Sequence, residues 1–287
     1  MDRACFIILN YNNYEKTIQS IRSLKELEVS GAILVVIDNN SNDRSVEFLN
    51  EEKKKTNFVL IESSVNGGFA AGNNIGIKYA LRKKFDYIII LNNDLQCQED
   101  IFTPMICYLK ENPSVAVVGP ELWNYKEATN SGNKINYTKI TFDNSISSDK
   151  SDLIIEADFL IGACLVVKAS AIREVGLMPE MYFLNYEETE WCLAFKQRGF
   201  KVQCLRKYKL VHEGGGTIDK YDGMQVYFLR RNIVLFERRN APLNKKIIFF
   251  IKLSVYSLIQ CLHEFSLNPI RSYYDGVTEK NRFSYLQ

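Results

Sequence analysis

The sequence predicts an α/β protein with a mostly parallel sheet flanked by helices, and three observations predict it. The chain has 287 residues, 46% of them hydrophobic, with only 6 prolines and 15 glycines. This composition excludes a disordered or collagen-like chain and allows one large domain or two small ones. Four short apolar runs lack polar alternation, as strands buried on both faces do. Segments with helical spacing separate the runs, as parallel strands require.

The first half of the chain alternates strands and helices. Residues 5–9, 32–37, 58–61 and 87–91 are apolar runs that end in polar turns, which is typical of strands. Apolar residues at helical spacing follow the first run and the third run, at Ile18, Ile21, Leu24 and Leu27 and at Ile75, Tyr79 and Leu81. The polar clusters follow the carboxyl ends of the strands, where open α/β sheets bind ligands. We therefore expect the four clusters to converge on one site.

The second half of the chain is less regular. Residues 122–152 are rich in Asn, Ser, Thr and Lys, which predicts an irregular excursion or short antiparallel strands. Ordered structure returns over 157–168, and helices are predicted over 169–175 and 187–197, the latter ended by Gly199. Residues 224–264 are predicted to be mostly helical.

Charge divides the chain into two unlike parts. Residues 1–195 carry 19 Lys and Arg against 27 Asp and Glu, a net charge of −8, whereas residues 196–287 carry 17 against 7, a net charge of +10. The basic part fits a phosphate-bearing ligand or an anionic membrane surface, and a solvated basic face is the alternative. The seven cysteines form no C-x-x-C pair. They predict reduced thiols in a cytoplasmic protein, and the opening residues give no sign of a signal peptide.

Two polar clusters fit the binding of a nucleotide. Asp38 follows the second strand, where a carboxylate accepts hydrogen bonds from a ribose or a base, although Asp is also an ordinary turn residue. The run Asn-Gly-Gly-Phe-Ala-Ala-Gly-Asn-Asn at 66–74 joins a strand to a helix. Its glycines allow close approach of a ligand to the backbone, but they match neither the dinucleotide nor the P-loop fingerprint. A tight left-handed turn is the alternative.

Three further clusters carry groups suited to catalysis or metal binding. Asn92-Asn93-Asp94 follows the fourth strand and suits a hard divalent cation that shares phosphate oxygens with a substrate, with a β-turn as the alternative. Glu187 and Glu188 open a predicted helix, either as caps of that helix or with one of them as a general base. His212 precedes three glycines and suits a metal or a phosphate, or a structural role.

In this order the motifs resemble those of family 2 glycosyltransferases of the GT-A fold, in particular the rhamnosyltransferase-like branch. The resemblance covers roughly residues 4–240. Its motifs are Ile-Leu-Asn-Tyr-Asn at 8–12, Asp-Asn-Asn-Ser at 38–41, the run at 66–74, Asn-Asn-Asp at 92–94, Gly162-Ala163, Glu187-Glu188, His212 and Arg231-Asn232. It implies a GT-A catalytic domain over 1–223, with a donor half at about 1–120 and an acceptor half at about 153–223. A helical extension follows over 224–287.

The resemblance also implies roles for individual residues. The donor-binding residues would be Asn10, Tyr11, Asp38, Asn66, Gly67, Gly72, Asn73, Asn92 and Asn93. Asp94 and His212 would hold Mg²⁺ or Mn²⁺ on the donor diphosphate. Asn92 replaces the first acid of the family's D-x-D motif, which leaves strict metal dependence open. Glu188 would be the catalytic base, with Glu187 as second candidate, and Trp191, Arg231 and Asn232 would contact acceptor or diphosphate.

The implied activity is an inverting transfer of a sugar from dTDP-rhamnose or a UDP-sugar. The acceptor would be a hydroxyl of a glycan or a lipid-linked molecule in bacterial surface polysaccharide synthesis, and no nucleic acid is expected. A catalytically silent nucleotide-sugar or carbohydrate-binding relative is the alternative. A nucleotide-sugar dehydrogenase or nucleotidyltransferase is disfavoured because the glycine fingerprints are missing.

The basic tail holds an apolar stretch at 247–262 that is interrupted by Lys252. A spanning helix needs about 20 apolar residues, so we expect no transmembrane span. Three interpretations remain: a buried core helix, a helix at the membrane interface, and a contact between copies in a homo-oligomer. The basic residues that precede the stretch favour the interface. The expected location is cytoplasmic, with peripheral contact on the inner face of the cell membrane.

Overall fold

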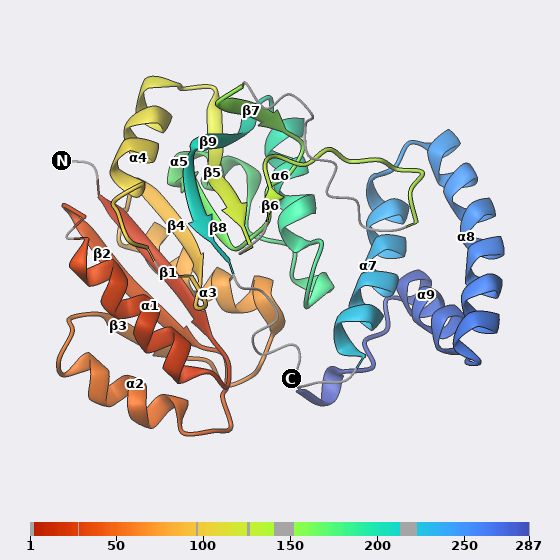
Figure 1. Cartoon of the computed structure of the whole chain (residues 1–287), viewed down its shortest axis with the longest axis horizontal. Helices are drawn as coiled ribbons and strands as arrows, with labels where there is room; N and C mark the ends of the chain where they lie inside the picture. Colours follow the sequence, from red (N-terminus) through yellow and green to blue (C-terminus); the bar gives the residue numbers. More distant parts are fainter. Residues whose placement is uncertain are drawn as a thin grey trace.

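A mixed sheet flanked by helices on both faces forms the body of the molecule (Figure 1). The computed structural model describes residues 3–27, 29–95, 97–124, 127–140, 152–212 and 223–286. Within these residues the strand order is β3-β2-β1-β4-β8-β5-β9-β7, with β6 paired to β5. The α/β fold predicted from the sequence is confirmed.

The strands predicted in the first half form one parallel block. Adjacent pairs β1–β2, β1–β4 and β2–β3 are parallel, and β5–β9 is the fourth parallel pair among the described residues. The pairs β4–β8, β5–β8, β5–β6 and β7–β9 are antiparallel. The strands are β1 (Ala4–Asn10), β2 (Ala32–Asp38), β3 (Val59–Glu62), β4 (Tyr87–Asn92), β5 (Val115–Trp123), β6 (Ala128–Asn130), β7 (Ile154–Ala157), β8 (Cys164–Lys168) and β9 (Lys201–Val211).

Helices cover the two faces of the sheet, and each face has its own apolar core. Alternate residues of β1 go to opposite faces, Ile7 to one core and Phe6 and Ile8 to the other, as the two-residue period of a strand requires. The first core packs against α3 (Gly68–Arg82), α5 (Ala169–Val175) and α6 (Glu187–Gln197). The second packs against α1 (Tyr14–Glu26), α2 (Ser45–Lys53) and α4 (Phe102–Glu111).

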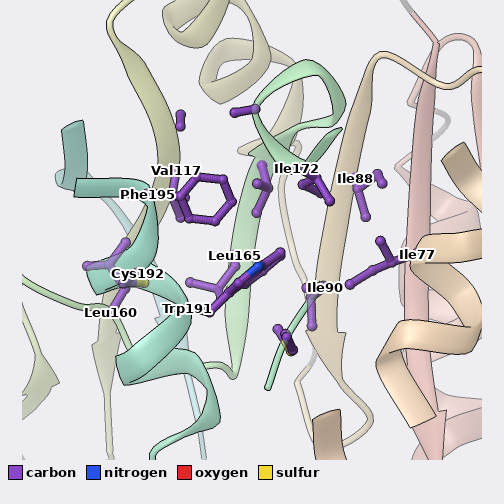
Figure 2. Packing of buried hydrophobic residues seen from close by; sticks show 14 of the residues in the cluster. Ile77, Ile88, Ile90, Val117, Leu160, Leu165, Ile172, Trp191, Cys192 and Phe195 are labelled. Carbon is purple, nitrogen blue, oxygen red and sulfur yellow. The ribbon is translucent and has the colours of Figure 1, made fainter. Parts of the chain in front are cut away.

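Trp191 belongs to the first core. Its side chain is 1% exposed, and its indole Nε1 donates to the carbonyl of Gly176 at 2.9 Å. Figure 2 shows the ring beside Leu165, between α6 and the sheet. Trp191 therefore fixes α6 on the sheet and is not open to an acceptor, which corrects its predicted role.

The C-terminal helices form a separate layer beside the sheet (Figure 1). These helices are α7 (Met224–Asn240), α8 (Leu243–Glu264) and α9 (Asn268–Thr278), and short 3₁₀ turns lie at Glu180–Tyr182 and Ser284–Leu286. Helix α8 has 22 residues, and its most apolar 18-residue window has a mean hydropathy of 1.4, so by length and composition it is able to cross a membrane. Only 17% of that window is buried, so α8 is not the buried core helix that was one interpretation of the sequence.

The stretch at 122–152 is only partly described. Residues 122–123 end β5, and 128–130 form β6, which pairs with β5 in an antiparallel hairpin. The short antiparallel strands that were one of the two structures predicted for this stretch are thus present at β5 and β6. Residues 125–126 and 141–151 lie outside the described part of the chain, as do residues 213–222 with their glycine run.

Candidate functional site

Polar side chains at the carboxyl edge of β1 and β2 bond to one another. Asn10 donates through Nδ2 to Asp38 Oδ1 at 2.8 Å, and Asp38 also accepts from the backbone N–H and the hydroxyl of Ser41 at 2.9 and 2.7 Å. Asn10 accepts from Thr17 at 2.6 Å, and the Thr17 hydroxyl accepts from Asn93 at 2.9 Å. The structure thus brings three predicted donor residues together in a preformed network. Thr17 was not predicted, because nothing in the sequence distinguishes it from other helix residues.

These network residues differ in how far they open to solvent. Asn10 and Asp38 are 0% and 1% exposed, so in this structure their side chains hold neighbouring residues in place and do not face solvent. Tyr11 and Asn93 are half-buried and lie nearer to solvent. A ligand at this edge would meet the second pair first.

The Gly-Asn run at 66–74 builds the next part of the edge. The Asn66 amide oxygen accepts from Asn39 Nδ2 at 2.8 Å and from the backbone N–H of Gly68 at 3.1 Å. Gly68 has a φ of +81°, and a Cβ there would lie 2.2 Å from the carbonyl oxygen of Phe183. Only glycine fits this position, because it needs both a left-handed backbone and a close backbone contact. Gly67 lies at the N-cap of α3, so its N–H is near the free end of a helix.

Two residues of the run act in packing rather than at the ligand edge. Gly72 lies inside α3, where a Cβ would come within 2.4 Å of Leu9 Cδ1, so its donor-binding role is corrected to helix–strand packing. Asn73 is 1% exposed and donates to the carbonyl of Phe69 at 3.0 Å. Its amide oxygen is buried without a hydrogen-bond partner among the described residues.

The Asn92-Asn93-Asp94 turn meets His212 at the end of β9. His212 Nε2 lies 3.4 Å from Asp94 Oδ1 and 3.3 Å from Asn92 Nδ2. The His212 backbone is fixed by an isolated bridge to Leu95 and by donation to the carbonyl of Trp123 at 2.8 Å. Burial acts to raise the pKa of Asp94, but the hydrogen bond and charge of His212 outweigh it, and the pKa is lowered. Asp94 is thereby kept as a carboxylate, the form that binds a cation.

These residues fit a divalent cation that is held partly by its substrate. Asp94 Oδ1 is buried and has no short hydrogen bond, and the His212 imidazole converges on it. Within the described residues no group of three or more His, Cys, Asp or Glu side chains could hold a metal. The described residues therefore offer two ligands, and phosphate oxygens and water would complete the shell, as is usual for Mg²⁺.

The two acids Glu187 and Glu188 open α6 after an unusual turn. Phe183, Asn185 and Tyr186 have φ values of +65°, +65° and +78°, a conformation that non-glycine residues rarely adopt. The two glutamates are 2% and 9% exposed, and Oε2 of each has no hydrogen-bond partner among the described residues. The turn is thus followed by two buried acids, each with one carboxylate oxygen left unpaired among the described residues.

Burial governs the charge state of this pair. It raises the pKa of Glu187 well above its usual range, and the neighbouring Glu188 charge raises it further. Burial also raises the pKa of Glu188, against the effect of backbone N–H groups that include those of Gly162 and Thr189. An acid with a raised pKa that still accepts backbone hydrogen bonds is suited to general base chemistry near neutral pH.

The Gly162-Ala163 turn connects the acid pair to the Asp94 region. The backbone N–H of Asn92 donates to the carbonyl of Ala163 at 2.8 Å. A Cβ on Gly162 would lie 3.6 Å from Glu188 Cβ and 3.1 Å from the ring of Phe69. The run at 66–74, the turn with Asp94 and Glu188 are therefore all connected through these two residues.

Arg231 and Asn232 lie in α7, away from any open surface. They are 2% and 0% exposed. The Arg231 guanidinium donates to the carbonyls of Met181, Glu279 and Lys280, and Asn232 donates to three carbonyls of the turn before α6. Direct contact of either side chain with acceptor or diphosphate is corrected, because their hydrogen-bonding groups are already used inside the protein.

Comparison with known proteins gives a family match over most of the sheet. The family described as Glycosyl transferase family 2 matches residues 5–176. The chain is 27% identical to the dTDP-rhamnosyl transferase RfbF of Shigella flexneri over 262 residues, which cover 88% of this chain and 85% of that protein. It is 24% identical to the low-salt glycan biosynthesis hexosyltransferase Agl10 of Haloferax volcanii over 243 residues, which cover 81% and 74%.

Solved structures share the fold at low sequence identity. Residues 1–349 of Staphylococcus aureus TarS in complex with UDP-GlcNAc align with a TM-score of 0.62 and 16% identity, over 99% of this chain and 83% of that one. The mannosyltransferase PcManGT from Pyrobaculum calidifontis, in complex with GDP-Man and Mn²⁺, aligns with a TM-score of 0.58 and 14% identity, over 96% and 73%. The chain spans 39% of a longer TarS chain.

Proposed function

Because the chain belongs to glycosyl transferase family 2 and is a glycosyltransferase, we propose that it transfers a sugar with inversion from a nucleoside-diphosphate sugar to an acceptor hydroxyl. The catalytic domain would span 1–223 and the helical extension 224–287. Glu188 is the proposed base, and Asp94 and His212 are the proposed metal ligands.

One observation carries this proposal: a single short turn contacts both reactive regions. Asn92 of the metal-binding motif donates to the carbonyl of Ala163, and the adjacent Gly162 packs against Glu188, since a Cβ on Gly162 would lie 3.6 Å from Glu188 Cβ. A base and a cation site must lie within one sugar ring of each other for direct displacement, because the acceptor oxygen and the leaving diphosphate attach to the same anomeric carbon. The shared turn supports this proximity.

The proposed reaction is one displacement. The acceptor oxygen forms a bond to the anomeric carbon as the bond from that carbon to the diphosphate oxygen breaks. The acceptor proton passes to the Glu188 carboxylate, and the bonding electrons leave with the nucleoside diphosphate. Attack from the face opposite the leaving group inverts the anomeric carbon.

A cation at Asp94 and His212 would neutralise the charge that develops on the departing diphosphate. The chain's own contribution is to keep Asp94 ionised and to hold His212 against β4 through Leu95. Asn92 contributes an amide in place of a second carboxylate, so phosphate oxygens would have to supply more of the negative charge around a cation. We propose Mg²⁺ or Mn²⁺, and PcManGT, whose structure contains Mn²⁺, supports a divalent ion.

The donor is proposed to be dTDP-rhamnose or a UDP-sugar. RfbF, whose name specifies dTDP-rhamnosyl transfer, supports the first, and TarS in complex with UDP-GlcNAc supports the second. The acceptor is proposed to be a glycan or lipid-linked hydroxyl in bacterial surface polysaccharide synthesis. Agl10, whose name specifies glycan biosynthesis, supports a glycan acceptor.

A panel of donors tests this function. The purified chain is mixed with dTDP-rhamnose, UDP-sugars or GDP-mannose, with Mn²⁺ or Mg²⁺, and both thermal stability and release of nucleoside diphosphate are measured. A true donor raises the melting temperature and is turned over with an acceptor glycan. Asn92 at the first acid position favours the second candidate, a silent binding relative. That candidate predicts the stabilisation without turnover, and no response to any donor contradicts both.

We also infer that α8 lies on an anionic membrane surface. Its outward residues are apolar and 41–75% exposed: Leu243, Ile247, Ile248, Ile251, Val255, Leu258, Ile259 and Leu262. At 100° per residue, those from Ile247 onward fall within an arc of about 120° that contains no charge. Lys245 lies at one border of this arc, where its amine can reach lipid phosphates, and Lys252 beside it donates to the Thr138 carbonyl at 3.5 Å. We call these eight residues the α8 apolar face.

Packing supports an in-plane helix over a spanning one. Phe249, Leu253 and Ser257 are buried on the opposite side of α8. Gln260 accepts from the Tyr273 hydroxyl of α9 at 2.7 Å, and Glu264 pairs with Arg230 of α7. A helix with one side fixed on the protein in this way cannot be surrounded by lipid.

Vesicle flotation tests the membrane contact. We expect the wild type to float with vesicles that contain phosphatidylglycerol, to bind pure phosphatidylcholine less and to be released by high salt. The triple variant Ile251→Asn, Leu258→Asn, Leu262→Asn should stay in solution. Ile154→Asn on β7, 47% exposed, is the matched control and should float. Dimerisation without flotation, or retention that resists salt and alkaline washing, would overturn the in-plane assignment.

A further inference from the structure

We propose that Asn232 is a positioning residue that holds the turn carrying Glu187 and Glu188. The proposal rests on the proposed role of Glu188 as the base. Helix α7 lies outside the sheet and the loops of the site, and in this proposal it controls the position of that base.

The contacts of Asn232 concentrate on a single turn. Its amide Nδ2 donates to the carbonyls of Tyr182, Leu184 and Asn185, at 2.9, 2.7 and 2.9 Å. One amide group, with two N–H donors shared among them, thus lies within hydrogen-bonding distance of three carbonyls within four consecutive residues. Asn232 is 0% exposed, so water does not compete for these bonds. Among the side chains that carry an amide NH₂, asparagine is the shorter, so its two N–H donors are held close to α7.

The turn needs this support because it is strained and lacks its own cap. Phe183, Asn185 and Tyr186 all have positive φ values, which disfavour residues with a Cβ. The N-cap of α6, Tyr186, makes no side-chain capping bond. Such a turn persists only when its surroundings determine it, and here the carbonyls of the turn face α7. Glu187 follows directly, so a shift of the turn would move both acids.

Arg231 fixes the orientation of the Asn232 amide. Arg231 Nη1 donates to Asn232 Oδ1 at 2.5 Å, so the oxygen faces the guanidinium and the NH₂ faces the turn. The same guanidinium bonds to the carbonyls of Glu279 and Lys280 after α9 and to Met181. The C-terminal segment is therefore tied through Arg231 and Asn232 to the turn before the base.

The turn also touches the donor edge. Phe183 accepts at its carbonyl from the backbone N–H of Phe69 at 2.8 Å, and Gly68 leaves no room for a Cβ against the same carbonyl. Asn232 thus acts at a junction between the donor loop and the acid pair. Its loss should displace the base while leaving the Asn10–Asp38 network intact, since that network makes none of these bonds.

The experiment compares Asn232→Asp and Asn232→Ala with Asn74→Ala. Asn232→Asp keeps the shape of the side chain but has no N–H donors. Asn74 is an equally buried asparagine of α3 that bonds to Met178 and Glu180, so its loss removes similar bonds without touching residues 182–185. Steady-state kinetics, the pH profile of kcat and backbone hydrogen exchange are measured on the full chain.

For both Asn232 variants we expect a 10- to 100-fold lower kcat, a donor KM within about twofold and faster exchange at residues 183–189. The acidic limb of the pH profile should move to lower pH, because a loosened turn exposes Glu188 to water and its pKa falls towards the ordinary value. Asn74→Ala should lose stability without moving that limb. A merely structural role would lower activity equally at every pH.

Unchanged exchange at 183–189 in the folded Asn232→Asp protein would overturn the proposal. So would an unmoved acidic limb in a folded variant. If Asn232→Ala does not fold, the near-isosteric Asn232→Asp decides. The exchange measurement needs no substrate, so it separates failure of this inference from failure of the proposed transfer reaction, which would appear as an inactive wild type.

Discussion

The buried carboxylates at the two sides of the candidate site have opposite surroundings. Asp38 is 1% exposed, and its two oxygens accept three hydrogen bonds from Asn10 and Ser41. Glu187 and Glu188 are 2% and 9% exposed, yet one oxygen of each has no hydrogen-bond partner in the described part of the chain. The Asp38 carboxylate is therefore fully hydrogen-bonded without a ligand, whereas the acid pair is not.

The contrast separates binding from chemistry. A satisfied network is rigid and can present a fixed edge to a nucleotide without rearrangement. A buried acid with a free oxygen has a raised pKa and an open position for a proton, which is what a base requires. On the acid side, α7 supplies the rigidity through Asn232 instead of through bonds to the acids themselves.

The largest effect is expected from Glu188→Gln. The amide cannot take the acceptor proton, so kcat should fall about 10²- to 10⁴-fold. Donor affinity should stay within a few-fold, because the Asn10–Asp38 network is untouched. Turnover by release of nucleoside diphosphate and donor binding by calorimetry check both parts. A variant that keeps a tenth or more of wild-type kcat would remove Glu188 from the role of base.

The pH profile sharpens the same point. Glu188 works as a base only when it is ionised, and burial raises its pKa. Activity should therefore decline on the acidic side at a pH above the ordinary glutamate value of 4.5. A kcat profile measured from pH 4.5 to 9 checks this, and an acidic limb centred at or below pH 4.5 would contradict it.

The next largest effect is expected from Asp38→Ala, which removes the acceptor of the hydrogen bonds from Asn10 and Ser41. Removal of the carboxylate leaves the buried N–H groups of Asn10 and Ser41 without this acceptor, so the free energy of unfolding should fall by about 1–3 kcal/mol. Donor affinity should weaken as well, because the edge loses its fixed shape. Denaturant unfolding and calorimetry measure the two. The exposed Asp86, which accepts only from the Arg3 backbone among the bonds described, is the control and should change stability by under about 0.5 kcal/mol when replaced by Ala.

The part of the site built on β1 and β2, around Asn10 and Asp38, is also the part that the sequence predicted well. The apolar runs that become β1, β2 and β4 are buried on both faces and bounded by polar turns, so local pattern and final structure agree. The strands β5 and β9 were not predicted. Both change register where they pair, between Pro120 and Glu121 on β5, so their pairing depends on contacts far apart in the chain.

The site residues whose roles the sequence did not predict also depend on contacts between distant parts of the chain. Asn10, Asp38, Asp94 and Glu188 follow strands or start a helix, and their positions could be read from motif order. Gly72 and Trp191 have residue types common at ligand sites, but their packing partners, Leu9 and the Gly176 carbonyl, come from other elements. The bonds from Asn232 to residues 50, 48 and 47 positions earlier leave no local pattern at all.

A smaller effect is expected from Glu237→Gln in α7. Glu237 is 2% exposed, and burial raises its pKa from 4.5 to about 8. Between these values the folded state binds more protons than the unfolded chain, so stability should fall as pH rises towards 8 and then level off. Glu237→Gln should remove this loss, about 1–2 kcal/mol between pH 6 and pH 8. Urea unfolding at several pH values checks it, and parallel curves for the two proteins would contradict it.

The smallest effect, expected from Glu187→Gln, tests which acid of the pair does the chemistry. Burial and the neighbouring Glu188 charge both raise the pKa of Glu187, so its ionised form destabilises the fold near neutral pH. The neutral amide should raise the free energy of unfolding by about 1 kcal/mol at pH 7.5 and lower kcat less than tenfold. It should leave the acidic limb of activity in place, because burial and the Glu188 charge keep Glu187 protonated at the pH where Glu188 ionises. If Glu187→Gln instead abolishes transfer while Glu188→Gln retains it, the base is the deeper acid, and Asn232 then positions Glu187.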